Sequence, residues 1–534
     1  MLATTPKVAA ISGRVVNIAP LVDGRGRMLP PCARAAKQRS RRVVNVTGAR
    51  PQLRVMIENN GNPREALMSA STSPSDAIGD AGARFVTPPV AAPQSSPGSF
   101  RLARLLSTDV LASFPAAAYE EESLTQNLFG KKRVVLSKPA AVRHVLLENY
   151  ANYCRPPASQ RTLRPMLGDG LLISEGESWR HQRRVIAPQF APRVIPMLGQ
   201  MILESTLDWV ATLKERAGQP IDLLREMRHL ALEIAGRTMF SIDTGEDGRI
   251  LRDQLEHFTE RLGHPRALDF LLPLWMPSPH DFPRRRFHAE MVRVVLRIMD
   301  RRLALPPSAH ARDLMELMAA ARDPETGAGF SRAQLLDEVT TMLVAAHETT
   351  SLALFWTLYL LSRAPREQER LADEASALEL VPNQVEPTLA DLVFTRAVAS
   401  ESLRLYPPAA VINRWALKDD HADGIDIPRG AMVVISPWVL HHHSQFWEDP
   451  YAFDPSRFMP DAPAPSRFVY LPFGAGPRIC VGAQLAMAEI ALVLAALLRD
   501  YRVACDDPHV PKPVSVIVTR PDRPIQFRLY PRRS

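Results

Sequence analysis

The chain alternates apolar and polar residues mainly at helical spacing, in segments bounded by proline. Two shorter runs rich in β-branched residues, KRVVLSK (132–138) and AMVVISPWVL (431–440), predict strands. No internal repeat is visible. The pattern therefore predicts a mainly α-helical fold with small β-sheets (α+β), packed as one large domain around a long central helix.

The most apolar segment, VTTMLVAAHETTSLALFWTLYLL (339–361), is long enough to span a bilayer. His347 and Glu348 lie at its centre among threonines and a serine, which is costly in lipid. The segment also begins with a capping box, Ser331 followed three residues later by Gln334. We therefore expect a helix through a globular core, and its buried polar centre needs a function.

A second long apolar helix is predicted at AQLAMAEIALVLAALLRDY (483–501), directly after the glycine-rich stretch FGAGPRICVG (473–482). Cys480 would then lie just before a helix N-terminus, where the macrodipole and free amides favour a thiolate. A sheltered thiolate is either a nucleophile or a metal ligand. The local sequence leaves both open.

Charge is concentrated at the N-terminus. Residues 1–57 hold eleven Lys or Arg and one acid, Asp23, which gives +10 against +8 for the whole chain, so the remainder carries −2. A linker rich in Ser, Pro, Gly and Ala follows at 71–99. We expect 1–84 to be a basic, disordered extension and 85–534 to be the folded domain. No nucleic-acid partner is expected of that domain.

Cysteine usage indicates a reducing compartment, since Cys32, Cys154, Cys480 and Cys505 show no CxxC spacing. No secretory signal is visible. An organelle transit peptide, a bacterial extension and a misassigned start codon all fit the basic N-terminus. We favour a bacterial, cytoplasmic protein, with organelle import as the alternative.

The motifs of the second half carry a family resemblance. FGAGPRICVG resembles the heme-binding loop of cytochromes P450, FxxGxRxCxG, at every defined position. Four further stretches resemble P450 motifs in the family's order: WRHQR (179–183), AAHETT (345–350), ESLR (401–404) and FDPSRF (453–458). The resemblance covers about residues 100–530.

This resemblance implies that Cys480 is the axial thiolate ligand of heme b (iron protoporphyrin IX), with Phe473 covering the sulfur. Gly474, Gly476 and Gly482 would let the backbone approach the porphyrin without Cβ clashes. The heme propionates would be met by Arg478, Trp179, Arg183 and Arg414.

The resemblance also implies that Thr349 and Glu348 deliver protons for the splitting of dioxygen. Threonine within a helix bonds back to the preceding turn and loosens it, which opens a groove. Ala346 stands where the family usually has glycine, so the shape of that groove is in doubt.

Glu401, Arg404 and Arg457 correspond to the family's structural triad. ExxR by itself is a weak motif, because ESWR (177–180) and EQER (367–370) match it too. The position of Glu401 before two prolines and upstream of the arginine-bearing motif selects it.

The expected function is a monomeric, heme-dependent monooxygenase without a transmembrane anchor. It would insert one oxygen atom from dioxygen into a C–H bond of a small lipophilic organic substrate. The electrons would come from a separate ferredoxin or flavoprotein, and Arg184 is a candidate for docking that donor. Alternatives within the fold are a peroxide-using or non-oxidative heme-thiolate enzyme and a heme-binding sensor.

A rival from another class rests on HHH (441–443), which is compatible with a zinc-binding helical interaction protein. Three consecutive histidines point apart in regular structure, which disfavours convergence on one ion.

Overall fold

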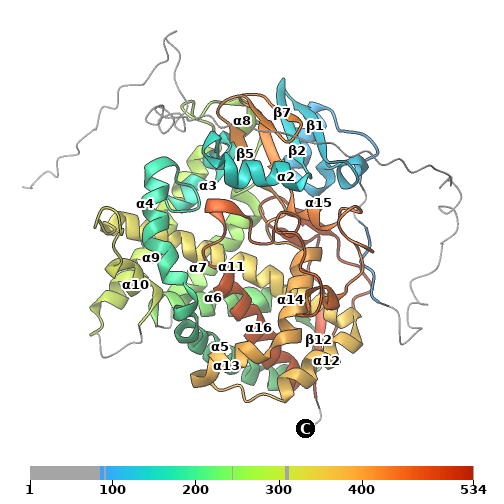
Figure 1. Ribbon diagram of the computed structural model, residues 1–534. Coiled ribbons are helices and arrows are strands. Elements are labelled where there is room, and N and C mark those ends of the chain that lie inside the picture. The colour runs from blue at the N-terminus through green and yellow to red at the C-terminus, as the bar shows by residue number, and fades with distance from the viewer. Residues whose placement is uncertain (1–83, 90–91, 243–244, 307–311, 533–534) are drawn as a thin grey trace, which may run out of the picture. The chain divides into compact units, whose positions relative to one another are not determined.

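The computed structural model describes residues 84–89, 92–242, 245–306 and 312–532, all within one compact unit. The predicted disordered extension, residues 1–84, lies outside the described residues except for Arg84. Helices dominate the described part (Figure 1). Their bounds are α1 Ser99–Thr108, α2 Pro139–Arg143, α3 Pro157–Leu167, α4 Gly176–Ile186, α5 Ile195–Thr212, α6 Leu223–Phe240, α7 Gly245–His257, α8 Ala267–Leu271, α9 Asp281–Ala304, α10 Leu314–Ala320, α11 Arg332–Arg363, α12 Pro365–Ser376, α13 Val385–Asp391, α14 Val393–Leu405, α15 Pro437–His441 and α16 Ala483–Asp500.

The central helix α11 begins where the sequence predicts. Ser331 Oγ accepts a hydrogen bond from the Gln334 amide at 3.3 Å, and Gln334 Oε1 accepts one from the Ser331 amide at 2.9 Å. This capping box satisfies two of the free N–H groups of the first turn. In Figure 1, α11 crosses the middle of the helical region, and it packs against α6, α14 and α16.

Short strands form four small sheets, the largest at one edge of the helices (top of Figure 1). Their bounds are β1 Ser123–Leu128, β2 Lys131–Leu136, β3 Tyr153–Cys154, β4 Ile221–Asp222, β5 Ile412–Ala416, β6 Asp420–Ala422, β7 Ile425–Ile427, β8 Met432–Ile435, β9 Tyr501–Ala504, β10 Pro513–Ser515, β11 Thr519–Pro521 and β12 Gln526–Pro531. The five-stranded sheet has the order β1-β2-β8-β5-β3, with β2 and β8 parallel and the other pairs antiparallel.

The strand predicted at 431–440 is only half right. Residues Met432–Ile435 form β8, but α15 begins at Pro437. Ser436 ends the extended segment, because its Oγ accepts a hydrogen bond from the Val439 amide at 3.2 Å and caps the new helix. Pro437 then occupies the first helical position, where its missing N–H costs nothing.

Two apolar cores flank the middle of α11. The larger core contains apolar residues from the C-terminal half of α11 and from most of α16. The other core contains apolar residues from the N-terminal half of α11, from α9 and from α10. Partly buried residues such as Leu485 contact both cores, so the start of α16 lies where the two meet. Among the described helices none combines the length and apolar character needed to cross a membrane.

Candidate active site

Cys480 lies in a fixed loop immediately before α16. Its amide donates to the Phe473 carbonyl at 3.0 Å, and Phe473 itself packs against the larger core. The sulfur is accessible although protein surrounds it. Burial raises the pKa of the Cys480 thiol, and the Gly482 amide and the Arg183 guanidinium partly oppose this. The chain therefore presents one reachable sulfur at a helix N-terminus.

Two glycines of this loop are required by the conformation and packing of the chain itself. Gly476 has a φ of 73°, and a Cβ there would collide with the backbone carbonyl of Leu146. Gly474 has a φ of 72°. Gly482 has an ordinary φ, and a Cβ there would meet nothing within 4 Å. The first two glycines are thus required by the fold of the chain itself.

Arg478, Trp179 and Arg183 converge on this loop. The Arg478 guanidinium lies 4.3 Å from the centroid of the buried Trp179 ring and forms an ion pair with Glu175. Arg183 Nη1 donates to the Ile479 carbonyl at 2.7 Å, which ties α4 to the residue before the cysteine. Sequence reasoning placed these three residues together, and the structure does the same.

Arg414 reaches the cluster from β5, and Arg155 joins it although the motifs did not identify it. Burial and repulsion by Arg478 lower the pKa of Arg414 to about 10. Burial and repulsion by Arg478 and Arg414 lower the pKa of Arg155 to about 9. Pairing of β3 with β5 aligns Cys154 with Trp415, so Arg155 follows opposite Arg414. The one sequence feature that could have pointed to Arg155 is its position directly after the short strand β3.

Within the described residues, the arginine cluster (Arg155, Arg183, Arg414 and Arg478) gathers around the carboxylate of Glu175. Glu175 pairs with Arg478 and lies 3.9 Å from Arg155 Nε, and its Oε1 accepts from the Arg155 amide at 3.0 Å. Arg155 Nε makes no hydrogen bond within the described part of the chain. A group with two carboxylates, such as heme with its propionates, fits this excess of positive charge.

The polar centre of α11 forms the opposite half of the site. Thr349 Oγ1 donates to the Ala345 carbonyl at 2.6 Å, as expected for threonine one turn on. Ala345, Ala346 and Thr349 are partly accessible within a helix that is otherwise mostly buried. This accessible stripe is where α11 offers room for a ligand.

Glu348 is held by a partner that the motifs did not reveal. Arg228 Nη2 on α6 donates to Glu348 Oε1 at 2.7 Å, and both residues are buried. Arg228 Nη1 lies 3.5 Å from Oε1 of Glu256, which is about half exposed. The neighbouring His347 is buried, and burial lowers its pKa to about 4. The acid beside Thr349 is thus linked through one arginine to a surface carboxylate.

The predicted triad is assembled away from the arginine cluster. Arg404 donates to both oxygens of Glu401, at 2.7 and 2.8 Å, and Arg457 Nε lies 3.6 Å from Glu401 Oε1. Arg404 also donates to the carbonyls of Pro450 and Ala452 at 2.7 and 3.0 Å. These bonds join α14 to the segment that precedes the cysteine loop. By contrast Glu177 and Arg180 form an exposed pair on α4.

Each histidine of the HHH tract bonds to a different backbone carbonyl. His441 contacts Arg404 O at 3.1 Å, His442 contacts Trp438 O at 2.8 Å, and His443 contacts Glu121 O at 3.3 Å. Among the described residues no group of three or more metal-ligating side chains is arranged to hold an ion. The geometry therefore offers nothing for the zinc-binding alternative.

Arg184 is ion-paired within the chain. Its guanidinium donates to both oxygens of Asp323 at 2.8 and 2.7 Å, and it lies 3.2 Å from Glu325. His181 Nδ1 contacts the same Asp323 at 2.8 Å. The side chain therefore fastens α4 to the segment before α11, and a role for Arg184 in meeting an electron donor stays a prediction.

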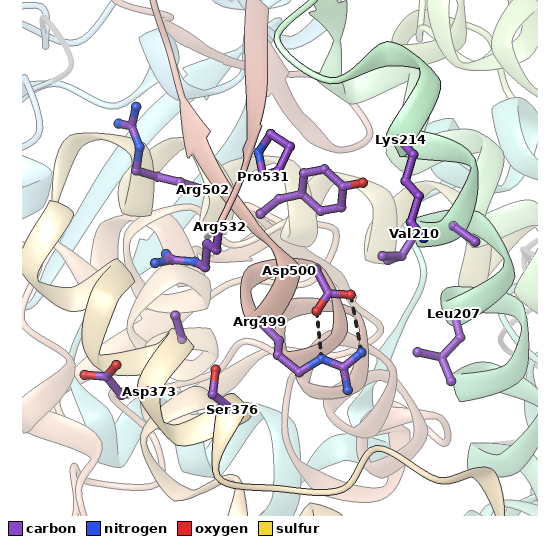
Figure 2. Close-up of a pocket in the computed structure, with 13 residues that line it drawn as sticks. Leu207, Val210, Lys214, Asp373, Ser376, Arg499, Asp500, Arg502, Pro531 and Arg532 are labelled. Atoms are coloured by element: carbon purple, nitrogen blue, oxygen red, sulfur yellow. Dashed lines mark hydrogen bonds and ion pairs between the residues drawn. The ribbon is translucent and has the colours of Figure 1, made fainter. Parts of the chain in front are cut away.

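A surface hollow of about 900 Å³ lies at the other end of α16. Figure 2 shows Lys214, Arg499, Arg502 and Arg532 around it, and Arg499 is paired with Asp500. None of its lining residues belongs to the cysteine loop, the arginine cluster or the centre of α11. We therefore treat the hollow as separate from the candidate site.

Comparison with known proteins identifies the family and the fold. The cytochrome P450 family model matches residues 118–529, more than half of the chain. This chain belongs to the cytochrome P450 family.

Similar P450 relatives come from plants and bacteria. A cytokinin hydroxylase of Arabidopsis thaliana is 30% identical over 75% of this chain and 79% of its own length. A cyclooctat-9-en-7-ol 5-monooxygenase of Streptomyces melanosporofaciens is 32% identical over 74% and 84%. The crystal structure of a cytochrome P450 (CYP102L1) has a TM-score of 0.67 at 23% identity, over 77% of this chain and 92% of that one, and shows the shared fold.

Membership makes the protein an oxidoreductase of the monooxygenase type with heme as the family's cofactor. The predicted family, the predicted mainly α fold and the predicted enzyme class are all confirmed.

Proposed function

We propose that Cys480 is the axial ligand of heme b in a P450 monooxygenase that hydroxylates a lipophilic molecule. The observation that carries this proposal is an accessible sulfur at the N-terminus of α16 beside an excess of buried arginine charge. When bound, the heme supplies the activation of dioxygen, and a thiolate ligand favours O–O cleavage.

The arginine cluster would hold the two propionates. Arg155 and Arg414 have lowered pKa values because they are buried together with Arg478, and Glu175 offsets only part of this effect. Two propionates would supply further carboxylates. Trp179, in contact with Arg478, would orient that guanidinium.

Thr349 and Glu348 would handle protons at the accessible stripe of α11. Thr349 Oγ1 already donates its hydrogen to the Ala345 carbonyl, so its lone pairs are free to accept one. Glu348 uses Oε1 for Arg228, whereas Oε2 makes no hydrogen bond within the described residues. The carboxylate is thus held by Arg228, and its other oxygen, 3.8 Å from His347 Nδ1, would be the one to exchange a proton.

The substrate class we propose is a lipophilic organic molecule. Val344, Ala345 and Ala346 give α11 an accessible face that is apolar. The Streptomyces relative is named for oxidising cyclooctat-9-en-7-ol, and the motifs resemble those of enzymes acting on fatty acids, steroids and terpenoids. Titration with such compounds should shift the Soret band of the holoenzyme, and small polar compounds should not.

The electron donor we propose is a separate ferredoxin or flavoprotein, in a bacterial cytoplasm. The Streptomyces relative agrees with that origin. Turnover should require NAD(P)H with a reductase–ferredoxin pair or a diflavin reductase. Turnover with peroxide but not with dioxygen and a reductase would instead favour the peroxide-using alternative.

Cys480→Ser tests the central assignment. The reduced wild-type protein with carbon monoxide should give the thiolate-type Soret band, and the variant should lose it while keeping its helical content. A wild-type protein that takes up no heme, or a variant that keeps the thiolate-type band, would overturn the proposal.

A further inference from the structure

His441, the first residue of the HHH tract, is completely buried at the end of α15. Its Nε2 accepts a hydrogen bond from the Leu471 amide at 2.8 Å. A peptide N–H is only a donor, so Nε2 must be the unprotonated nitrogen. The proton is then on Nδ1, which donates to the Arg404 carbonyl at 3.1 Å. Two backbone groups therefore fix both the ring and its tautomer.

The two groups that His441 joins belong to different parts of the fold. Arg404 is at the end of α14 and carries the triad, whereas Leu471 opens the loop that leads to the cysteine. The Leu471 carbonyl accepts from the Gly474 amide at 3.1 Å, and the next bond along, Cys480 N to Phe473 O, is 3.0 Å. A continuous set of backbone hydrogen bonds thus runs from the imidazole to the residue that bears the sulfur.

The triad supports His441 from the other side. Arg404 Nη1 donates to the His441 carbonyl at 2.8 Å, while the Arg404 carbonyl receives the ring proton. Tyr470, next to Leu471, has its ring centroid 5.2 Å from the imidazole and donates from its hydroxyl to the Ser400 carbonyl at 2.8 Å. The start of the cysteine loop is therefore fastened to α14 by two neighbouring residues.

The environment of His441 keeps the ring neutral. Burial, followed by the nearby His442 and Arg404, holds the pKa of His441 well below its usual range. A protonated ring would present a second N–H to the Leu471 amide and break that bond. The neutral form is therefore the one that the fold requires.

The geometry points to His441 as a positioning residue for Cys480: it fixes the cysteine loop to the triad and so sets where the sulfur lies. This inference rests on the proposed function, in which Cys480 binds heme iron. It also gives the HHH tract a role without a metal. The ring nitrogens of His442 and His443 bond instead to the carbonyls of Trp438 and Glu121.

The experiment compares His441→Leu with His442→Leu in the heme-loaded protein. Both substitutions remove a buried imidazole of one tract, but only the first frees the Leu471 amide. His441→Leu should lower the fraction of the reduced carbon-monoxide complex with the thiolate-type band, and Leu471 should exchange its amide hydrogen about five- to tenfold faster. His442→Leu should keep both properties at wild-type values.

His441→Gln keeps the test decisive if the leucine variant does not fold. A glutamine oxygen still accepts from the Leu471 amide, so this variant should recover most of the thiolate-type band. Full thiolate-type signal in His441→Leu, or equal losses in the His441 and His442 variants, would overturn the positioning role. Cys480→Ser separates the two hypotheses. If this variant also keeps the thiolate-type band, the assignment of Cys480 as the heme ligand is wrong. If it loses the band while the His441 variants give an overturning result, only the positioning role of His441 is wrong.

Discussion

Arg228 Nη2 and Glu348 Oε1 are 2.7 Å apart, so a guanidinium from α6 holds the acid that precedes Thr349. The two residues are 120 positions apart in the chain. Removing one partner of a buried ion pair leaves the other charge uncompensated, at a cost of about 3–5 kcal/mol.

We therefore expect Arg228→Met to be strongly destabilised in urea unfolding. Glu348→Gln combined with Arg228→Met should recover much of that loss, because no charge is then left buried. Strictly additive losses in this double-mutant cycle would show that the two side chains do not interact.

Thr349→Ala should change the chemistry more than the stability. The substitution removes one hydrogen bond to the Ala345 carbonyl, at a cost of about 1 kcal/mol. If the hydroxyl handles protons, the variant should consume dioxygen with less product and more hydrogen peroxide. Thr349→Ser retains the hydroxyl and should stay close to wild type in the same oxygen-electrode assay.

Arg404→Lys should destabilise the fold although it preserves the charge. Lysine cannot reproduce the paired bonds to Glu401 together with those to the carbonyls of His441, Pro450 and Ala452. We expect a loss of several kcal/mol, on the scale of about 3–5 kcal/mol for a broken buried pair, and poor retention of heme. Arg180→Lys is the control, because its pair with Glu177 is exposed. Equal thermal stability of the two variants would contradict the expectation.

Glu338 should make stability depend on pH. It is fully buried on α11, and burial raises its pKa from 4.5 to about 8. Between these values the folded state keeps a proton that the unfolded state has released, so this residue's contribution to stability falls as pH rises from about 4.5 to about 8. The change amounts to at most about 5 kcal/mol.

Glu338→Gln removes this titration while keeping an acceptor for the Leu171 amide, which donates to Glu338 at 3.0 Å. Urea unfolding at pH 5.5 and pH 8 should show the variant gaining stability relative to wild type at the higher pH. A constant difference between the two proteins would mean that Glu338 is already ionised in the fold.

Gly476→Ala should prevent the cysteine loop from adopting its folded conformation. The residue has a φ of 73°, and its Cβ would overlap the Leu146 carbonyl, a backbone atom that cannot move aside cheaply. We expect loss of the thiolate-type carbon-monoxide band. Gly98→Ala, at the residue before α1, is the control, because its φ of −63° is ordinary and its Cβ meets nothing within 4 Å, and it should retain heme.

Local signals made part of this structure predictable. The capping box at Ser331, the glycine-rich loop at Cys480 and the spacing from Glu401 to Arg404 each depend on residues close together in the chain. The contacts of Arg228, Arg155 and Asp323 were not predicted. Each joins residues that are far apart in the sequence, and the local sequence around a charged residue does not indicate which distant partner it will contact in the fold. The strand ending at Ile435 was misjudged for a similar reason: a serine cap outweighed the β-branched run.

The crowding of Arg155, Arg414 and Arg478 around Glu175 has a consequence for the life of the protein in a cell. An anionic ligand that binds only the folded chain stabilises it by mass action. The abundance of this enzyme should therefore follow the porphyrin supply, and chains made during a shortage should be the first that proteases remove.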